Sequence, residues 1–328
     1  MMRLVSRFAM AVILALAGVS GAAAPSGKLA LYTSQPDRDA AQTVEAFRKK
    51  HPAVEVEIFR SGTTEVMNKL LAEFAAGAPR PDVLLIADAG SMERLRGEGR
   101  LLAHPAADVA QLPAGAVDRD RTYFGTKLIT TGIVYHSSAP RKPTSWKDLT
   151  APEARGQVVM PSPLYSGAAA IHMAALTGHP ALGLRYYEDL AKNGALAVRG
   201  NGAVASAVAG GQKMYGVLVD FMALNAKAKG SPVEFVFPAE GVTAVTEPVA
   251  ILRTARNPDA ARAFVDFILS REGQALATKQ GYLPARKDVA PPPGFPRLET
   301  ITIVPVDIEA YLLKNEANKK RFADLFGG

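Results

Sequence analysis

The stretch Gln157-Val-Val-Met-Pro-Ser-Pro-Leu-Tyr-Ser-Gly-Ala-Ala-Ala-Ile-His172 decides the expected fold. Its apolar run, Val158–Met160, predicts a short buried strand, and the two prolines after it end the strand because proline offers no amide to a sheet. Ser166 suits the N-cap of a following helix, and Gly167 lets a ligand approach the backbone. The free amides of such a helix start would form an anion site, although an ordinary capped turn has the same sequence pattern.

The alternation of strand and helix precedes this stretch three times and continues after it. Apolar runs at Lys28–Tyr32, Val54–Phe59 and Pro81–Ala87 predict strands, and each is followed by a polar turn and a segment with helical spacing of apolar residues. Further strands are expected at residues 130–135, 156–160, 195–199, 214–220, 234–237 and 246–252. Repeated units of this kind predict an α/β fold with doubly wound, parallel sheets.

Length and composition favour a globular protein with two domains. The chain has 328 residues, of which 48% are hydrophobic and 21% are charged. The net charge is +7 and the pI is near 9.5, which would fit a nucleic-acid-binding protein. However, the basic residues are scattered among acidic ones, and no basic run with interleaved aromatic residues occurs. We therefore expect no nucleic-acid partner.

The N-terminal segment, residues 1–24, has the pattern of a secretory signal peptide. Arg3 and Arg7 supply its positive charge, and Phe8–Val19 is an apolar run too short to span a bilayer. Small residues then allow cleavage after residue 22, 23 or 24. With no cysteine, the chain has no disulfide, thiolate metal site or cysteine-linked lipid anchor. These features predict an exported protein of the bacterial periplasm.

The expected strands end in turns of one kind, in which hydroxyl residues and glycine precede a helix. In an open α/β sheet, ligands bind beyond the carboxyl ends of the strands, so turns from two facing sheets would line one cleft. A cleft of amides and hydroxyls suits a phosphate or phosphonate, with Arg60 as the nearest cation. The candidate ligand-binding residues in these turns are Tyr32, Thr33, Ser34, Ser61, Gly62, Thr63, Asp88, Ser162, Tyr165, Ser166, Gly167, Ala168 and Asn201.

Acidic residues at strand ends add a second element to the expected site. Asp220 follows the apolar strand Met214–Val219, where it either caps the next helix or meets an ammonium or metal ion. Asp88 is open to the same two interpretations, and Glu247 lies near an expected crossing between domains. Oxyanion-seeking turns together with an acid fit a zwitterion that carries a phosphonate and an amine. We expect no cofactor.

Motifs for catalysis are missing from the sequence. The turn Tyr165-Ser-Gly167 lacks the leading glycine of a nucleophile elbow, no pair of histidines has metal-ligand spacing, and no P-loop occurs. We expect a protein that is not an enzyme. A secreted hydrolase, with Ser166 as its nucleophile, is the alternative from another class.

Taken together, the chain resembles the periplasmic solute-binding proteins of bacterial ABC importers, in the branch of the ferric-iron and organophosphate or phosphonate binders. The segments that carry this resemblance are Leu29–Ser34, Phe59–Thr63, Pro81–Ala89, Ser145–Leu149, Pro161–Gly167, Asn201–Val208 and Gly281–Arg286. The resemblance implies a type II-like fold of two lobes that close on a ligand by hinge motion, a monomer, and a cognate ABC permease as partner. Residues 25–130 and 243–328 would form the first lobe and residues 131–242 the second, joined by two crossing strands near 128–135 and 236–247.

The resemblance also guides the choice of ligand. Ferric binders carry two adjacent tyrosines where this chain has Asp220-Phe221-Met222. The loss of this pair favours 2-aminoethylphosphonate, with Asp220 and Asp88 as candidate partners of its amine. Ferric iron, held by Tyr32 and Tyr165 with a synergistic anion, is the alternative within the family, and no other metal site is expected.

Overall fold

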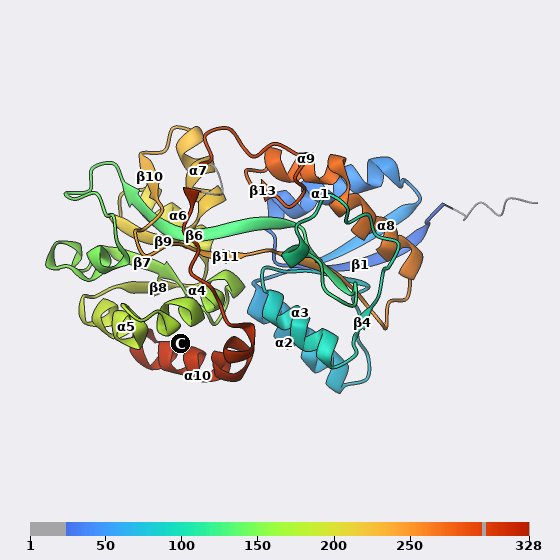
Figure 1. Cartoon of the computed structure of the whole chain (residues 1–328), viewed down its shortest axis with the longest axis horizontal. Helices are drawn as coiled ribbons and strands as arrows, with labels where there is room; N and C mark the ends of the chain where they lie inside the picture. The colour runs from blue at the N-terminus through green and yellow to red at the C-terminus, as the bar shows by residue number, and fades with distance from the viewer. Residues whose placement is uncertain (1–23, 297–299, 328) are drawn as a thin grey trace, which may run out of the picture.

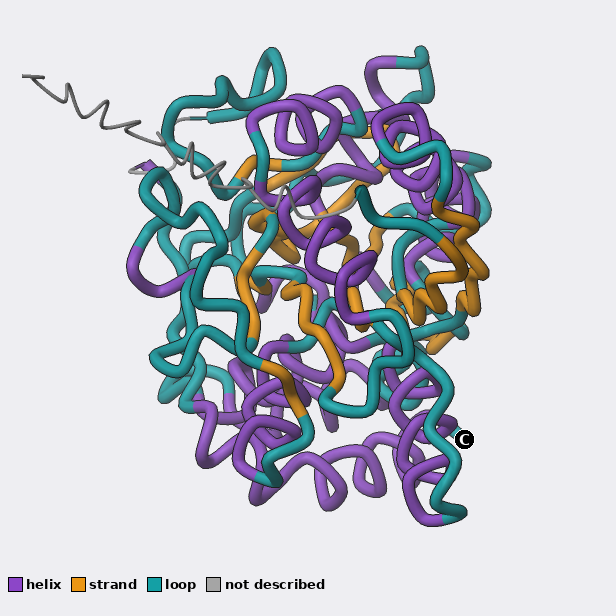
Figure 2. Tube along the Cα trace, turned by 90° about the vertical axis from the view of Figure 1, so that its right-hand side faces the viewer, coloured by secondary structure: helices purple, strands orange, loops and turns teal. Residues whose placement is uncertain are grey.

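The computed structural model describes residues 24–296 and 300–327, so the predicted signal peptide lies outside the described residues except for Ala24. The chain forms two sheets, each covered by helices, which lie side by side as two lobes (Figure 1). Seen from the side, helices lie above and below the strands (Figure 2). The predicted α/β class and two-lobed architecture are confirmed, but the expected parallel sheets are both mixed, since each contains antiparallel pairs.

The first lobe is built on the sheet β2-β1-β3-β12-β4, with β5 paired to β12. β1 pairs in parallel with β2 and β3, whereas β12 runs antiparallel to its neighbours. Side chains alternate along β1, so that Leu31 packs with Phe264 on one face and Tyr32 packs with Leu70 on the other. Its strands are β1 (Gly27–Thr33), β2 (Val54–Arg60), β3 (Val83–Leu85), β4 (Leu101–Leu102), β5 (Tyr123–Gly125) and β12 (Pro248–Leu252), and its helices are α1 (Asp37–Lys50), α2 (Thr63–Ala75), α3 (Ala89–Gly97), η1 (Ala114–Ala116), α8 (Pro258–Leu269) and α9 (Arg271–Lys279).

The second lobe is built on the sheet β10-β6-β9-β7-β8, to which β11 and β13 add by pairing with β6. β7, the strand of the deciding stretch, is buried throughout and pairs in parallel with β8 and β9. Its strands are β6 (Lys127–His136), β7 (Val158–Pro161), β8 (Leu196–Val198), β9 (Tyr215–Val219), β10 (Val233–Val236), β11 (Thr243–Val245) and β13 (Leu283–Pro284), and its helices are η2 (Trp146–Thr150), η3 (Pro152–Ala154), α4 (Gly167–Gly178), α5 (Gly183–Lys192), α6 (Asn201–Ala209) and α7 (Asp220–Ala228).

Two crossings of the chain between the lobes are adjacent, between β5 and β6 and between β11 and β12, and the chain crosses again after α9. The two crossings are hydrogen-bonded to each other: the amides of Thr126 and Lys127 donate to the carbonyl of Thr246 at 3.0 and 3.3 Å. The hydroxyl of Thr126 donates to the carbonyl of Glu247 at 2.7 Å. These two adjacent crossings therefore form one hinge, joined by three hydrogen bonds.

The C-terminal part of the chain departs from the predicted lobe boundary. β11 belongs to the second sheet, and helix α10 (Ile308–Phe326) packs mainly on α4 and α5 of the second lobe, with a smaller contact to α3 of the first (Figure 1). Phe322 and Tyr311, both buried, anchor α10 in the two core clusters of that lobe. The helical spacing of apolar residues in the tail predicted a helix. It could not show on which lobe that helix packs.

No helix within the described ranges is long and apolar enough to cross a membrane.

Candidate ligand-binding site

A cavity of about 420 Å³ lies between the two lobes and is lined by residues of both. The first lobe contributes Ser34, Pro36, Arg60 and Thr63 among others, from the turns after β1 and β2. The second lobe contributes the turns after β7, β8 and β9. The cavity thus lies where the carboxyl ends of strands from two sheets face each other, as the sequence predicted.

Helix N-termini surround this cavity. Thr63 of α2, Ala168 of α4 and Gly202 of α6 all line it, each within the first two residues of its helix. Ser166 caps α4 by accepting a hydrogen bond from the amide of Ala169 at 3.3 Å. The amides of Ala168 and Gly202 donate to no acceptor in the described part of the chain. Free amides and the positive ends of three helix dipoles therefore meet in one space, which favours an anion.

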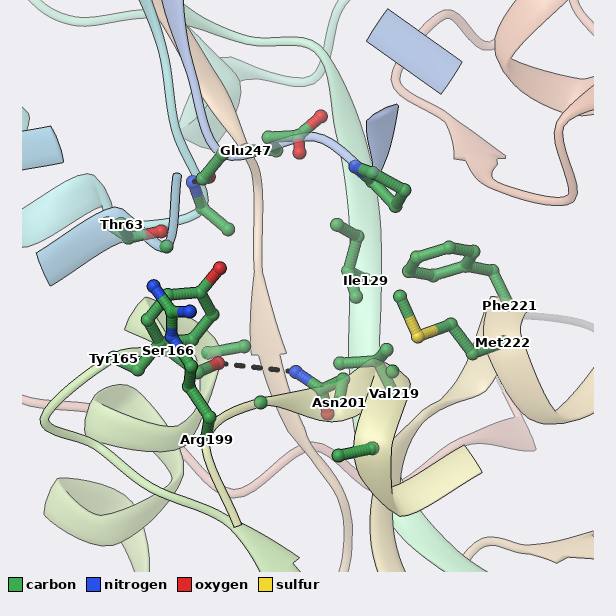
Figure 3. Close-up of a pocket in the computed structure, with 18 of the residues that line it drawn as sticks. Thr63, Ile129, Tyr165, Ser166, Arg199, Asn201, Val219, Phe221, Met222 and Glu247 are labelled. Atoms are coloured by element: carbon green, nitrogen blue, oxygen red, sulfur yellow. Dashed lines mark hydrogen bonds between the residues drawn. The ribbon is translucent and has the colours of Figure 1, made fainter. Parts of the chain in front are cut away.

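Two arginines add positive charge at the edge of the cavity, and Tyr165 holds both. Arg60 donates through Nη1 to the hydroxyl of Tyr165 at 3.2 Å and through Nε to the carbonyl of Gln35 at 2.7 Å. The guanidinium of Arg199 lies 4.5 Å from the centroid of the Tyr165 ring and pairs with both carboxylate oxygens of Glu65 at 3.0 Å. Figure 3 shows Arg199 and Tyr165 together on one side of the cavity. Such planar donors suit the oxygens of a phosphoryl group.

The opposite side of the cavity is apolar. Ile129 of β6, Val219 of β9, and Phe221 and Met222 of α7 lie there in Figure 3, and Tyr282 completes the wall. The rings of Phe221 and Tyr282 pack together with centroids 4.2 Å apart. A ligand bound here contacts polar amides on one side and carbon atoms on the other.

Glu247 lines the cavity at the hinge and is 2% exposed. Its Oε2 lies 2.5 Å from Nζ of Lys127, which is also buried, and 3.4 Å from Nε2 of Gln35. Asp37, the other acid in the lining, has a side chain that is 86% exposed. Glu247 is therefore the buried carboxylate of this cavity.

The two lobes touch around the cavity. The amide of Thr64 donates to the carbonyl of Tyr165 at 3.2 Å, and its hydroxyl donates to the carbonyl of Pro163 at the same distance. Gly62 lies so near that a Cβ on it would fall 2.4 Å from the Tyr165 carbonyl oxygen. The structure therefore has the lobes closed over the cavity.

The predicted ligand-binding residues divide into two equal groups. The structure brings seven of them together in the lining: Ser34, Gly62, Thr63, Tyr165, Ser166, Ala168 and Asn201. The other seven, Tyr32, Thr33, Ser61, Asp88, Ser162, Gly167 and Asp220, are not part of the lining. Their side chains or backbone have partners within the protein.

Asp220, which we expected to bind the amine of the ligand, has partners within the protein instead. One of its carboxylate oxygens accepts hydrogen bonds from the amide and the hydroxyl of Thr130 at 2.9 and 2.7 Å, and the other accepts from the amide of Phe221 at 2.6 Å. Burial raises its pKa to about 6. Asp220 thus ties β6 to the start of α7 and does not line the cavity. Asp88, the second candidate, caps α3 and accepts a hydrogen bond from Tyr311 at 3.0 Å.

The residues expected to hold ferric iron are not brought together. The hydroxyl of Tyr32 donates to Glu73 at 2.7 Å on the face of β1 that packs against α2, and burial raises the pKa of this phenol above its ordinary value. Only Tyr165 of the predicted pair lines the cavity. No group of three or more histidine, cysteine or acidic residues suited to a metal ion occurs in residues 24–296 and 300–327.

The remaining candidate residues stabilise the turns in which they lie. The hydroxyl of Thr33 donates to the carbonyl of Leu85 at 2.8 Å, that of Ser61 donates to Glu65, and Ser162 accepts from the amide of Leu164 at 3.2 Å. Gly167 has no room for a side chain, since a Cβ there would lie 2.6 Å from the carbonyl oxygen of Ala87. This glycine therefore lets the lobes approach each other.

Sequence reasoning did not select Arg199, Phe221, Met222 or Tyr282, which also line the cavity. Arg199 directly follows β8 and precedes the turn that begins α6, so the rule applied to the other strand ends would have found it. The apolar wall had no such signal, because its residues look like ordinary core residues in the sequence.

Comparison with known proteins agrees with this geometry. Residues 34–283 match the family described as bacterial extracellular solute-binding protein. An uncharacterized protein of Haemophilus influenzae is 29% identical over 282 residues, which cover 80% of this chain and 79% of that protein.

Three solved structures have the same fold. AfuA of Actinobacillus pleuropneumoniae, a periplasmic binding protein with exogenous fructose-6-phosphate bound, has a TM-score of 0.83 at 23% identity, with 91% of this chain and 98% of AfuA covered. The periplasmic binding protein P5PA has a TM-score of 0.81 at 20% identity over 92% and 100% of the two chains. Iron-bound HitA of Pseudomonas aeruginosa has a TM-score of 0.77 at 20% identity over 90% and 99%. The family match spans well over half of the chain, and it confirms the predicted assignment to the periplasmic solute-binding proteins of ABC importers: the chain belongs to the family of bacterial extracellular solute-binding proteins.

Proposed function

We propose that this protein captures a small phosphorylated or phosphonate compound in the periplasm and delivers it to a cognate ABC permease, and that 2-aminoethylphosphonate is such a ligand. One observation carries the proposal: three helix N-termini, with free amides at Ala168 and Gly202, meet in a single cavity between the lobes. Fixed amides and helix dipoles bind an oxyanion without a surplus of charged side chains.

The charges around the cavity support this class of ligand. Arg60 has Asp37 at 3.7 Å, Arg199 has Glu65, and Lys127 has Glu247, so each cation already has an acidic neighbour. A bare multivalent cation would have to displace these arginines and lysine from the acids. An anion instead gains hydrogen bonds from the amides and from the remaining N–H groups of the two guanidinium groups. The fructose-6-phosphate in the structure of AfuA is a further reason to expect a phosphoryl group.

Closure of the lobes would complete the site. Thr63 comes from the first lobe, whereas Ser166 and Asn201 come from the second, so an anion that contacts both sides stabilises the closed state. The hydrogen bonds of Thr64 to residues 163 and 165 then hold the closed lobes together. Binding of this kind needs no covalent step, and we propose that the protein acts as a monomer without a cofactor or catalytic activity.

The test is calorimetric titration of the mature protein with 2-aminoethylphosphonate, fructose 6-phosphate, inorganic phosphate and ethanolamine, which has the amine but no phosphoryl group. We expect binding of phosphoryl compounds and none of ethanolamine. Replacing Arg199→Ala should weaken phosphoryl binding, whereas Arg185→Ala, which removes an 81% exposed guanidinium on α5, should not.

Two results would contradict the proposal that the protein binds a phosphoryl compound. If no phosphoryl compound binds and Fe³⁺ produces a coloured complex, the phosphoryl proposal is wrong and the ferric alternative takes its place. Turnover of a phosphoester that is lost in Ser166→Ala would instead support the hydrolase.

A further inference from the structure

We propose that Glu247 determines the ligand specificity of this site by accepting a hydrogen bond from an N–H or O–H group on the organic part of the ligand. This inference rests on the proposed function, because it assumes that a phosphoryl group occupies the amide-lined part of the cavity. It narrows the ligand class to short phosphorylated or phosphonate compounds with a donor group away from the phosphorus.

The first observation is the backbone of Glu247. Its φ angle is +37°, in the left-handed region that favours glycine, and Arg121 is the only other described non-glycine residue with a positive φ. The surrounding hinge fixes this conformation, since the carbonyl of Glu247 accepts a hydrogen bond from Thr126 and that of Thr246 accepts two amides. A glycine would fit this backbone with less strain, so the glutamate side chain stands at a position that the backbone conformation alone would not favour.

The second observation is that only one oxygen of the Glu247 carboxylate has partners among the described residues. Both of its partners, Nζ of Lys127 at 2.5 Å and Nε2 of Gln35 at 3.4 Å, lie against Oε2. Oε1 has no hydrogen bond to any residue that the structure describes, and it does not belong to the fully buried polar atoms without a partner, so it is open to the cavity that Glu247 lines. A carboxylate oxygen offers two acceptor positions, so Oε1 can accept a hydrogen bond from a group inside the cavity. Since Glu247 lines the cavity, a bound ligand is the group that can supply the donor.

The third observation is the position of Glu247 relative to the anion site. In Figure 3, Glu247 lies across the cavity from Ser166 and Asn201, where α4 and α6 begin. Ile129, Phe221 and Met222 form the wall between these two ends. A ligand with its phosphoryl group at the helix N-termini would therefore lay carbon atoms along the wall and place its far end near Glu247.

A purely structural role for the pair of Lys127 and Glu247 explains less. A buried ion pair is often no more stabilising than apolar residues of similar volume. Here Lys127 is additionally held over the ring of Tyr282, at 4.1 Å from its centroid, and Tyr282 itself lines the cavity. Lys127 thus fixes the direction of the Glu247 carboxylate without covering Oε1.

Three compounds with the same two-carbon chain test the inference: 2-aminoethylphosphonate, 2-hydroxyethylphosphonate and ethylphosphonate, which differ only in an ammonium, a hydroxyl or a hydrogen at the far carbon. Calorimetry on the wild-type protein should show at least one of the first two binding about tenfold or more tightly than ethylphosphonate, the equivalent of one buried hydrogen bond. Fructose 6-phosphate and inorganic phosphate serve as further phosphoryl probes.

The double variant Lys127→Met with Glu247→Leu removes both members of the pair and so leaves no buried charge unpaired. It should bind all three phosphonates within about threefold of each other, at a level close to that of ethylphosphonate on the wild type. Glu57→Gln, which alters an exposed carboxylate paired with Lys28, is the matched control and should keep the wild-type preference. Circular dichroism and thermal unfolding establish that each variant is folded, and Glu247→Gln provides a second, more conservative variant.

The outcomes separate the two proposals. If the wild type binds the phosphonates equally, or if the folded double variant keeps the preference, the inference about Glu247 is wrong while phosphoryl binding stands. If none of the phosphonates, fructose 6-phosphate and inorganic phosphate binds the wild type, the proposed function itself fails.

Discussion

The hydroxyl of Tyr311 donates a hydrogen bond to the carboxylate of Asp88 at 3.0 Å, and this contact joins the two lobes at a point outside the hinge. Tyr311 belongs to α10, which packs on the second lobe, whereas Asp88 caps α3 of the first. Both residues are buried, and Gly90 makes room for the tyrosine ring, since a Cβ there would lie 2.3 Å from it. The C-terminal helix therefore bridges the lobes.

Replacing Tyr311→Phe should destabilise the closed protein. The change leaves the buried carboxylate of Asp88 with one donor fewer, at an expected cost of about 1 to 2 kcal/mol in the free energy of unfolding. Urea denaturation measures this cost, and small-angle X-ray scattering without ligand should show a larger radius of gyration if the contact holds the lobes together. Tyr135→Phe is the control, because the hydroxyl of Tyr135 has no hydrogen bond among the described residues. Equal stability of the two variants would contradict the bridging role.

Gly62→Ala should impair lobe closure without disturbing either lobe. Gly62 has an ordinary φ of −64°, so alanine is compatible with its backbone. Its Cβ would nevertheless lie 2.4 Å from the carbonyl oxygen and 2.6 Å from the ring of Tyr165, in the opposite lobe. We expect at least a tenfold loss of affinity for the phosphoryl ligand at unchanged unfolding stability, both measured on the purified protein. Gly97→Ala, with no atom within 4 Å of the added Cβ, should behave like the wild type. A wild-type affinity in Gly62→Ala would mean that closure does not bring these turns into contact.

The sequence predicted the position of the site better than the role of each residue. Strand periodicity and N-cap residues locate the turns after β1, β2, β7 and β8, because these signals are local. The partners of the turn residues are not local: Asp220 is bound by Thr130, which lies 90 positions earlier in the chain. The partner of the Tyr32 hydroxyl, Glu73, likewise lies 41 positions later in the chain. For this reason the cleft could be predicted, but the division between lining residues and structural residues could not.

The pH dependence of stability should reflect His172. Burial lowers the pKa of this histidine to about 3, against 6.5 in the unfolded chain, because the neutral ring is packed against Trp146 and its Nε2 has no hydrogen-bond partner among the described residues. Between these values the unfolded chain takes up a proton that the folded protein does not. The free energy of unfolding should therefore fall as the pH falls from 6.5 towards 3, by up to about 1.4 kcal/mol per pH unit.

His172→Gln removes this titration, so the free energy of unfolding should fall less steeply as the pH falls below 6.5. Any loss of stability caused by the substitution itself is the same at every pH and does not change this slope. Urea denaturation between pH 4 and 7 provides the curve, with the fluorescence of Trp146, the single tryptophan of the chain, as the signal. His136→Gln, which changes a partly exposed histidine at the end of β6, is the control and should keep the wild-type slope. An unchanged slope in His172→Gln would show that His172 is not the group responsible.

Asp220→Asn separates a structural carboxylate from a ligand-binding one. Because burial raises the pKa of Asp220 to about 6, the folded protein binds a proton between about pH 4 and 6 that the unfolded chain has released, and this titration makes the wild type more stable as the pH falls. The variant lacks this gain, so its stability deficit relative to the wild type should grow on acidification from pH 7 to 4.

The affinity of Asp220→Asn for 2-aminoethylphosphonate at pH 7.5 should stay within about threefold of the wild-type affinity. Asp220 does not line the cavity, and its carboxylate oxygens are bound by Thr130 and Phe221. Arg199→Ala should show the reverse, a loss of affinity at nearly constant stability. A loss of more than tenfold in affinity in a folded Asp220→Asn protein would instead restore Asp220 as the partner of the amine and displace Glu247 from that role.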